Sequence, residues 1–220
     1  MKRKPADETA PRAEKTYHHG DLRRALLDAT LPLVQTHGVQ GFTLRQAARA
    51  AGVSHNAPYR HFPSRAHLLV ALATEGQEAL LKLLTTRLAG AINERARLDR
   101  LGGAYVDFAR SREALFRVMF SGEVYSNRTP ELAAAQARTF QFFREELRRA
   151  ESAGLIRPGH ADRGALVGWS AIHGATLLLL DGVIGGSEIA GKRSPRQLAR
   201  LVIEIVLSGL SADATPAPAR

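Results

Sequence analysis

Apolar residues recur at helical spacing along most of the chain. The first such run, at intervals of four, three and four, is Leu22, Leu26, Ala29 and Leu33. These intervals place the four side chains on one face of a helix. Gly38 is suited to end this helix, and Pro32 predicts a kink or an earlier end because proline lacks the amide hydrogen. Alternation with a period of two does not persist, so the pattern does not predict strands.

Two short helices and several longer ones are expected next. Thr43 with Gln46 three residues later forms a capping-box pattern, which begins a helix that Gly52 closes. Ser54 is a suitable N-cap for a third short helix. Later helices are expected near 64–89, 97–111, 113–120, 130–153, 162–184 and 195–209. The sequence therefore predicts an all-α fold.

The stretch 42–62 has the features of a helix-turn-helix. Gly52 in the tight turn can adopt a positive φ at low cost. Small residues that let the two helices approach closely are Ala47, Ala48 and Ala51. The core between the helices is expected to be closed by Leu44, Val53, Tyr59 and Phe62. The polar side of the second helix is then free to enter the major groove of DNA.

That polar side carries residue types that suit contacts with DNA. The expected base-reading residues are Ser54, His55, Asn56 and Arg60. Asparagine can pair with adenine and arginine with guanine in bidentate fashion. Ala57 and Pro58 are expected to contact thymine methyl groups. The expected phosphate ligands, which fix the register on the duplex, are Thr43, Arg45, Tyr59 and Arg65.

The charge of the chain agrees with an anionic partner. The 220 residues carry a formal net charge of +10, of which +6 falls in residues 1–65 and +4 in the rest. A basic surplus of this kind favours nucleic acid, although an arginine-rich composition alone could produce it. Residues 1–16 lack an apolar period and are expected to form a disordered basic arm, and residues 211–220 a disordered tail.

Other classes of protein find less support. The chain has no cysteine, which excludes disulfides and thiolate metal sites and is compatible with the cytoplasm. No uninterrupted apolar run reaches the length of a membrane span, and no secretory signal is visible, so no membrane partner is expected. The eight histidines form no metal-ligand spacing, and no phosphate-binding glycine loop appears, so neither a metal, a cofactor nor an enzyme is expected.

Three strings between residues 43 and 69 also resemble a known family. They are Thr-Leu-Arg-Gln-Ala-Ala (43–48), Ala-Gly-Val-Ser (51–54) and Tyr-Arg-His-Phe-Pro-Ser-Arg (59–65), followed by Leu68-Leu69. Together they are similar to the DNA-binding domain of TetR/AcrR-type regulators, over about residues 18–80. The resemblance implies a DNA-binding domain at 17–64 and a larger helical domain at 65–210 that binds an effector and forms a homodimer. Pro58 departs from the family pattern, in which Leu or Ile is commoner.

The C-terminal half resembles the family over one short string. Trp169-Ser170-Ala171-Ile172-His173-Gly174 is similar to the Trp-x-x-x-His-Gly signature of one TetR-type C-terminal subgroup. Residues expected to line an effector pocket are Tyr105, Phe108, Phe116, Met119, Phe120, Phe140, Phe143, Trp169 and His173; each of them could instead be core. Residues expected at a four-helix dimer interface are Gly164, Gly168, Ala171, Ala175, Ile203, Val206 and Leu207.

The resemblance implies a ligand-released repressor that binds a pseudo-palindromic, double-stranded operator. The effector is an unknown small molecule. The alternatives are an enzyme, a non-specific chromatin-like binder, and an activator, since the sign of regulation depends on where the operator lies. Beyond residue 65 acidic residues largely offset the basic ones, which disfavours the non-specific binder.

Overall fold

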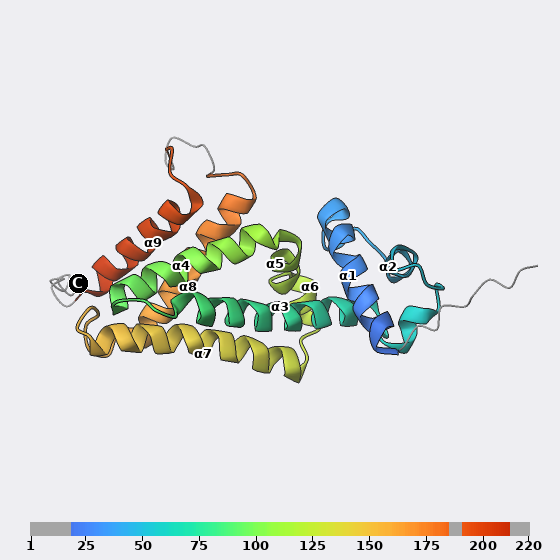
Figure 1. Ribbon diagram of the computed structural model, residues 1–220, viewed down its shortest axis with the longest axis horizontal. Coiled ribbons are helices and arrows are strands. Elements are labelled where there is room, and N and C mark those ends of the chain that lie inside the picture. The colour runs from blue at the N-terminus through green and yellow to red at the C-terminus, as the bar shows by residue number, and fades with distance from the viewer. Residues whose placement is uncertain (1–18, 185–190, 212–220) are drawn as a thin grey trace, which may run out of the picture.

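A computed structural model of the chain describes residues 19–184 and 191–211, in which all regular structure is helical (Figure 1). The predicted arm at 1–16 and nearly all of the predicted tail at 211–220 lie outside the described residues. The elements are α1 (His19–His37), α2 (Leu44–Ala50), a short 3-10 helix η1 (Ala57–Arg60), α3 (Arg65–Leu88), α4 (Glu94–Ser111), α5 (Glu113–Met119), α6 (Gly122–Ser126), α7 (Pro130–Ser152), α8 (Ala161–Leu180) and α9 (Pro195–Leu210). The all-α prediction is confirmed.

The helices form a small N-terminal head and a larger bundle. The head contains α1, α2 and η1, and Figure 1 shows it at one end of the long axis. Helix α3 begins in the head and continues through the bundle, where it packs against α4, α5 and α7. Helices α8 and α9 pack against each other and against α4. The head therefore connects to the bundle through the continuous helix α3 and through α1, which packs against α5.

The first helix differs from its sequence pattern in two respects. It does not end at Pro32 but continues to His37, because Pro32 lies on the solvent-exposed side, where a missing backbone hydrogen bond is replaced by water. Its buried stripe is Leu26, Leu27, Thr30 and Val34, one position away from the predicted one. Gly38 follows the helix with a φ of 74°, as its predicted role as a stop requires.

The third helix is shorter than predicted and begins later. Only Ala57–Arg60 is helical, as one turn of 3-10 helix, and Asn56 rather than Ser54 occupies the N-cap position. An α-helix capped by Ser54 would need an amide hydrogen at Pro58 to reach the carbonyl of Ser54. Proline has none, and its ring also disfavours α geometry at Ala57, so the amide of Ala57 bonds Ser54 instead, at 3.0 Å.

Most other boundaries agree with the sequence pattern. Thr43 and Gln46 make both hydrogen bonds of the predicted capping box, and Pro130 and Pro195 each occupy the first turn of a helix. The sequence pattern missed α6, which has only five residues. Helix α8 ends at Leu180, four residues before its predicted end.

Helix α8 is unusually apolar on its outer side. It is 20 residues long with a mean hydropathy of 1.2 in its most apolar window, enough in length and composition to cross a membrane, and 22% of that window is buried. The sequence argument, which counted uninterrupted apolar runs, did not detect it. Asp162, Arg163 and His173 interrupt its apolar sequence, and its exposed large apolar residues are Leu166, Val167 and Leu178.

Candidate nucleic-acid interface and ligand cavity

In the head, residues 54–56 and the side chains of Tyr59 and Arg60 in η1 are exposed to solvent. Helix α2 buries Leu44, Ala47 and Ala48, and the turn that follows requires Gly52, whose φ is 70°. Phe42 and Phe62 are also buried and close the same core. This packing fixes the orientation of the exposed segment 54–60 relative to α2, as a DNA-reading module requires.

Most of the predicted DNA ligands lie on the surface of the head. Those with exposed side chains are Thr43, Arg45, Ser54, His55, Asn56, Tyr59 and Arg60. Ala57 is half-buried. The Thr43 hydroxyl lies 2.9 Å from the side-chain oxygen of Gln46, so it serves the helix cap while its residue remains at the surface. The outward polar face predicted from the sequence is therefore present, although a 3-10 turn carries it.

The helix-turn-helix segment is basic and free of acids. Residues 39–64 contain Arg45, Arg49 and Arg60 and no Asp or Glu. All three arginines are exposed, and no ion pair to them exists within the described part of the chain. Sequence reasoning overlooked Arg49, although its position one helical turn after Arg45 on the same face was a usable signal. The segment thus offers unneutralised cations to a polyanion.

Three expectations for this module need correction. Pro58 is buried against the head, so it cannot contact a thymine methyl group. Tyr59 is 49% exposed and does not close the core, which leaves it to the predicted phosphate contact. Arg65 donates to the carbonyl of Val39 at 2.6 Å and to the carboxylate of Glu123 at 2.5 Å.

The contacts of Arg65 join the head to the bundle. Its guanidinium also lies 5.3 Å from the centre of the Phe42 ring, and Glu123 belongs to α6. A half-buried arginine held by a carbonyl, a carboxylate and an aromatic face is poorly placed to bind phosphate. Its role in this structure is to attach the start of α3 to the bundle.

The bundle contains a cavity of about 410 Å³, open to solvent on one side, between α3, α5, α6, α7 and α8. Its lining comprises Gln77, Leu80, Met119, Phe120, Tyr125, Arg128, Gln136, Ala137, Thr139, Phe140, Phe143, Trp169 and His173. The volume is in the range of small-molecule sites, and the wall is mainly apolar with a few polar groups, which is typical of such sites. Six of the nine residues predicted for an effector pocket line it.

The other three predicted pocket residues belong to the core. Tyr105, Phe108 and Phe116 are essentially inaccessible and do not line the cavity. Tyr105 packs edge-on against Phe116 with ring centres 5.6 Å apart. Residue type alone could not separate them from the lining residues, because the same aromatic side chains fill the core and the wall.

One core residue nevertheless supports the cavity wall. The Tyr105 hydroxyl lies 2.8 Å from Nδ1 of His173, which fixes the ring that faces the cavity. Burial raises the pKa of Tyr105, and burial lowers the pKa of His173. Both groups are therefore uncharged near neutral pH, and this end of the cavity has no fixed charge.

Sequence reasoning missed the polar part of the cavity wall. Gln77, Gln136 and Thr139 contribute hydrogen-bonding groups, and Arg128 contributes a cation. A usable signal existed for Gln77, which interrupts the apolar face of α3 between Ala73 and Leu80. A polar residue on a core-facing stripe is a reason to look for a partner.

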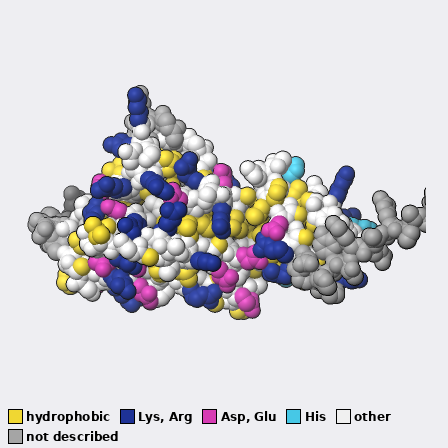
Figure 2. All heavy atoms as spheres, in the orientation of Figure 1, with side chains coloured by type: hydrophobic (Ala, Val, Ile, Leu, Met, Phe, Trp, Pro, Cys, Tyr) yellow, Lys and Arg dark blue, Asp and Glu magenta, His cyan; other side chains and the backbone are white. Residues whose placement is uncertain are grey.

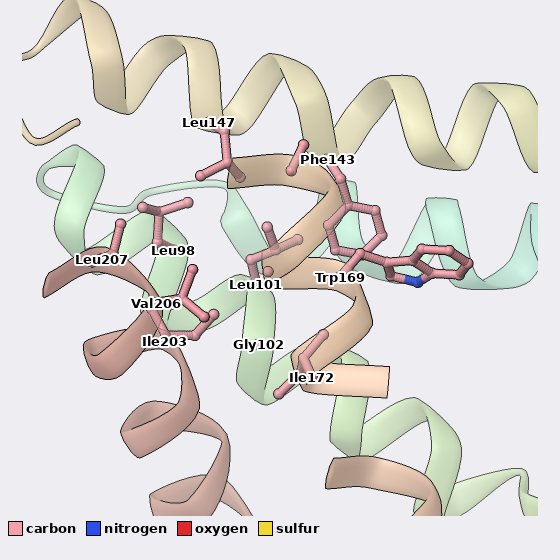
Figure 3. A pocket seen from close by; sticks show the side chains of 12 residues that line it. Leu98, Leu101, Gly102, Phe143, Leu147, Trp169, Ile172, Ile203, Val206 and Leu207 are labelled. Carbon is pink, nitrogen blue, oxygen red and sulfur yellow. The ribbon is translucent and has the colours of Figure 1, made fainter. Parts of the chain in front are cut away.

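The predicted dimer interface is partly wrong. Gly164 faces Leu210 of the same chain, and Leu207 is buried in the core. Figure 3 shows Ile203, Val206 and Leu207 near Leu98 and Leu101 around a small apolar void of about 30 Å³. Gly168 lines the same void. These residues hold α9 on its own subunit, whereas Ala171 and Ala175 are half-buried.

The outer face of α8 nevertheless carries exposed apolar side chains, and α9 adds one among exposed polar residues. The large hydrophobic residues exposed there are Leu166, Val167, Leu178 and Ile205. Elsewhere on the bundle Lys and Arg side chains are interspersed with Asp and Glu, as one face in Figure 2 shows. A group of exposed apolar side chains with polar residues around it is typical of a protein interface.

Comparisons with known proteins agree with this arrangement. Residues 26–72 match the family model described as "Bacterial regulatory proteins, tetR family". Residues 98–206 match "Tetracyclin repressor-like, C-terminal domain". The second match includes Trp169 and Gly174 but does not test the Trp-x-x-x-His-Gly subgroup, which stays a prediction.

Individual relatives cover different parts of the chain. A structure of a protein of unknown function from Rhodococcus sp. RHA1 is 34% identical, with a TM-score of 0.74, covering 90% of this chain and all of that one. The nucleoid occlusion factor SlmA of Marinobacter nauticus is 28% identical over 62% of this chain and 70% of its own length. The transcriptional repressor KstR of Rhodococcus jostii is 46% identical over 24% of this chain and 26% of its own.

Proposed function

The chain belongs to the TetR family of bacterial regulatory proteins, which are DNA-binding transcription regulators, and from that premise we propose a ligand-released repressor. It binds a pseudo-palindromic operator as a homodimer in the cytoplasm, and a small molecule in the bundle weakens that binding. The observation that carries the proposal is the exposed, acid-free segment 39–64 with its polar face at 54–60. The name of KstR supports the repressing sign.

The proposed reading mode uses few base contacts per subunit. Asn56 and Arg60 are exposed on the outward turn and suit adenine and guanine, while Arg45, Arg49 and Tyr59 flank them as phosphate ligands. One head of this size has little specificity by itself. Two heads about 34–36 Å apart would read two successive major grooves, so dimerisation has a direct use.

The proposed dimer forms through the outer faces of α8 and α9. Leu166, Val167, Leu178 and Ile205 are all exposed in the single subunit. Burying these side chains against a second copy would remove apolar area from water at about 25 cal/mol per Å². This face replaces the inward-facing Gly164 and Leu207 in the interface predicted from the sequence.

The cavity is physically connected to the head. Gln77 and Leu80 place α3 in the cavity wall, and α3 continues to Arg65 at the base of the head. Helix α6 contributes Tyr125 to the wall and Glu123 to Arg65. A ligand that favours one placement of α3 or α6 would shift the position of the head. The free energy of that shift cannot exceed the difference in ligand binding free energy between the two states.

The proposal is tested by selecting bound duplexes from a random pool with the full-length protein. The expected result is a palindromic motif whose half-sites are about one helical turn apart. Binding to that motif should exceed binding to a scrambled duplex at the same ionic strength, and both should weaken as salt rises.

A matched control uses Arg138→Gln. Arg138 is an exposed arginine on α7 that pairs with Glu78 at 3.5 Å, far from the head in sequence. This variant should select the same motif as the parent chain. Enrichment of no motif, or equal affinity for all duplexes along the salt series, would favour the non-specific binder instead.

A further inference from the structure

We propose that the 410 Å³ cavity takes a monoanionic aromatic carboxylate, with its carboxylate at Arg128 and an uncharged polar group at Gln77. This inference rests on the proposed ligand-responsive function and names the chemical class of the effector. Three features of the wall carry it: an amide that faces the cavity without a protein partner, a lone cation, and a set of aromatic faces.

Gln77 supplies an amide that faces the cavity. The residue is 3% exposed, lines the cavity, and its side chain makes no hydrogen bond to any described residue. Its amide atoms are not among the buried polar atoms that lack a partner, because they reach the open cavity, where a ligand group can replace water as their partner. The sequence retains this amide on a stripe where Ala73 and Leu80 are apolar. A ligand group that both donates and accepts, or either alone, would satisfy it.

Arg128 sets the sign of the ligand charge. Of all residues that line the cavity, Arg128 is charged and none is acidic. Its guanidinium lies 5.9 Å from the centre of the exposed Tyr125 ring, and no carboxylate in the described part of the chain pairs with it. A ligand ammonium group would find no counter-ion here, whereas a carboxylate can form a charge-assisted bond. One guanidinium balances one negative charge.

The aromatic wall sets the shape of the ligand body. The centre of the Trp169 ring lies 6.4 Å from that of Phe120 and 6.0 Å from that of Phe140. These flat faces come from three different helices or their ends, and each can stack on a planar ring. The deep end at His173 is uncharged, since burial lowers the pKa of that imidazole. The carboxylate therefore belongs at the exposed end, near Arg128.

The test uses tryptophan fluorescence of the full-length dimer, because Trp169 is the sole tryptophan in the sequence. The probes share one body and differ in charge: 4-phenylbutyrate, 4-phenylbutyramide and 4-phenylbutylamine. We expect the acid to bind about fivefold more tightly than the amide, the gain of one partly exposed ion pair, and the amine to bind most weakly. Equal affinity of the acid and the amine would overturn the proposal, as would no response to the acid.

Two variants assign the contacts, with Arg87→Gln as the matched control. Arg87 is an exposed arginine at the far end of α3 that does not line the cavity. Arg128→Gln should abolish the preference for the acid over the amide, and Arg87→Gln should preserve it. A preference that survives in Arg128→Gln would overturn the assignment of the anion site.

Gln77→Leu separates a binding role from a structural one. It replaces an amide that has no protein partner by an apolar group of similar size, so the unliganded melting temperature should stay level or rise. Affinity for 4-(4-hydroxyphenyl)butyrate, whose carboxylate can reach Arg128 while its hydroxyl reaches Gln77, should fall about threefold or more. A lower melting temperature with unchanged affinity would show that the amide supports the fold and does not bind ligand. Operator selection without ligand is unaffected by any of these outcomes, so it tests the proposed function separately.

Discussion

The exposed side chains of the head are of two kinds: those that suit contacts with bases and those that suit contacts with phosphates. Arg60 lies on the outward turn beside Asn56, while Tyr59 is half-exposed on the same turn. A bidentate arginine contact to guanine depends on sequence, whereas a tyrosine hydroxyl on a phosphate does not. The two residues are adjacent but should therefore affect DNA binding in different ways.

Arg60→Ala should relax the sequence preference at one position of each half-site. The expected loss is about 1–3 kcal/mol on the selected motif and much less on a duplex mutated at that position. Tyr59→Phe should weaken binding to all duplexes by a similar factor. Electrophoretic mobility shifts on a panel of single-base operator variants measure both effects. The opposite pattern would mean that the two residues have exchanged roles.

His173, in the cavity wall, should make the stability of the fold depend on pH. Because burial lowers its pKa, the folded chain stays unprotonated where the unfolded chain takes up a proton, near the usual value of about 6.5. The unfolded state binds more protons there, so the stability of the fold falls as the pH is lowered through that value. The neighbouring Tyr105 stays protonated throughout, since burial raises its pKa.

His173→Gln should reduce this acid sensitivity. The melting temperature of the parent chain is expected to fall more between about pH 7.5 and about pH 5.5 than that of the variant. His37→Gln is the control, because His37 is exposed at the end of α1, and it should retain the parent's pH dependence. Equal slopes for the parent and His173→Gln would show that this imidazole does not titrate differently on folding.

At the scale of elements, helix boundaries followed from short-range chemistry. Thr43 with Gln46, and Pro195 after Ser194, specify where α2 and α9 begin, because caps depend on residues three positions apart. The third helix does not begin after Ser54 as predicted, because Pro58 lacks the amide hydrogen that a helix capped by Ser54 would need. Local rules thus fix most ends, and a single proline accounts for the main exception.

The faces of these elements were harder to predict than their ends. A period of 3.6 residues shows that α8 and α9 are amphipathic, but not whether an apolar residue meets its own subunit or a second copy. Gly164 and Leu207 turn inward while Leu166 and Ile205 turn outward. Likewise, Phe116 and Phe120 lie four positions apart, yet only Phe120 lines the cavity. Tertiary packing decides these cases, and it is not encoded in spacing alone.

Two helical glycines should respond oppositely to alanine. A Cβ on Gly168 would lie 3.7 Å from Val206, an ordinary contact, so Gly168→Ala should stabilise the fold by about 0.5–1 kcal/mol. A Cβ on Gly76 would lie 2.6 Å from the Met119 sulfur, which must then move into the cavity that it lines. Gly76→Ala should bring no gain or a loss. Chemical denaturation measures both, and equal gains would contradict the close packing of α3 on α5.

At the scale of the whole molecule, DNA binding should depend on the outer faces of α8 and α9. Ile205→Glu places a charge on a side chain that is 63% exposed in the single subunit, so the fold should persist. The charge would be buried in the proposed dimer, which disfavours association. Sedimentation should therefore detect monomers, and operator affinity should fall at least tenfold.

Ile92→Glu provides the control for this variant. Ile92 is 87% exposed in the loop between α3 and α4 and belongs to neither α8 nor α9. It should leave both the sedimentation coefficient and the operator affinity unchanged. A dimer that persists in Ile205→Glu would place the interface on another face.

The length of α3 has a mechanical consequence. Its 24 residues form a rod of about 36 Å that starts at the base of the head and ends deep in the bundle. A tilt of about 10° at one end swings the other by about 6 Å, more than the rise of one base pair. Gln77 lies near the middle of this rod, so a displacement of α3 at the cavity would be about doubled at the groove.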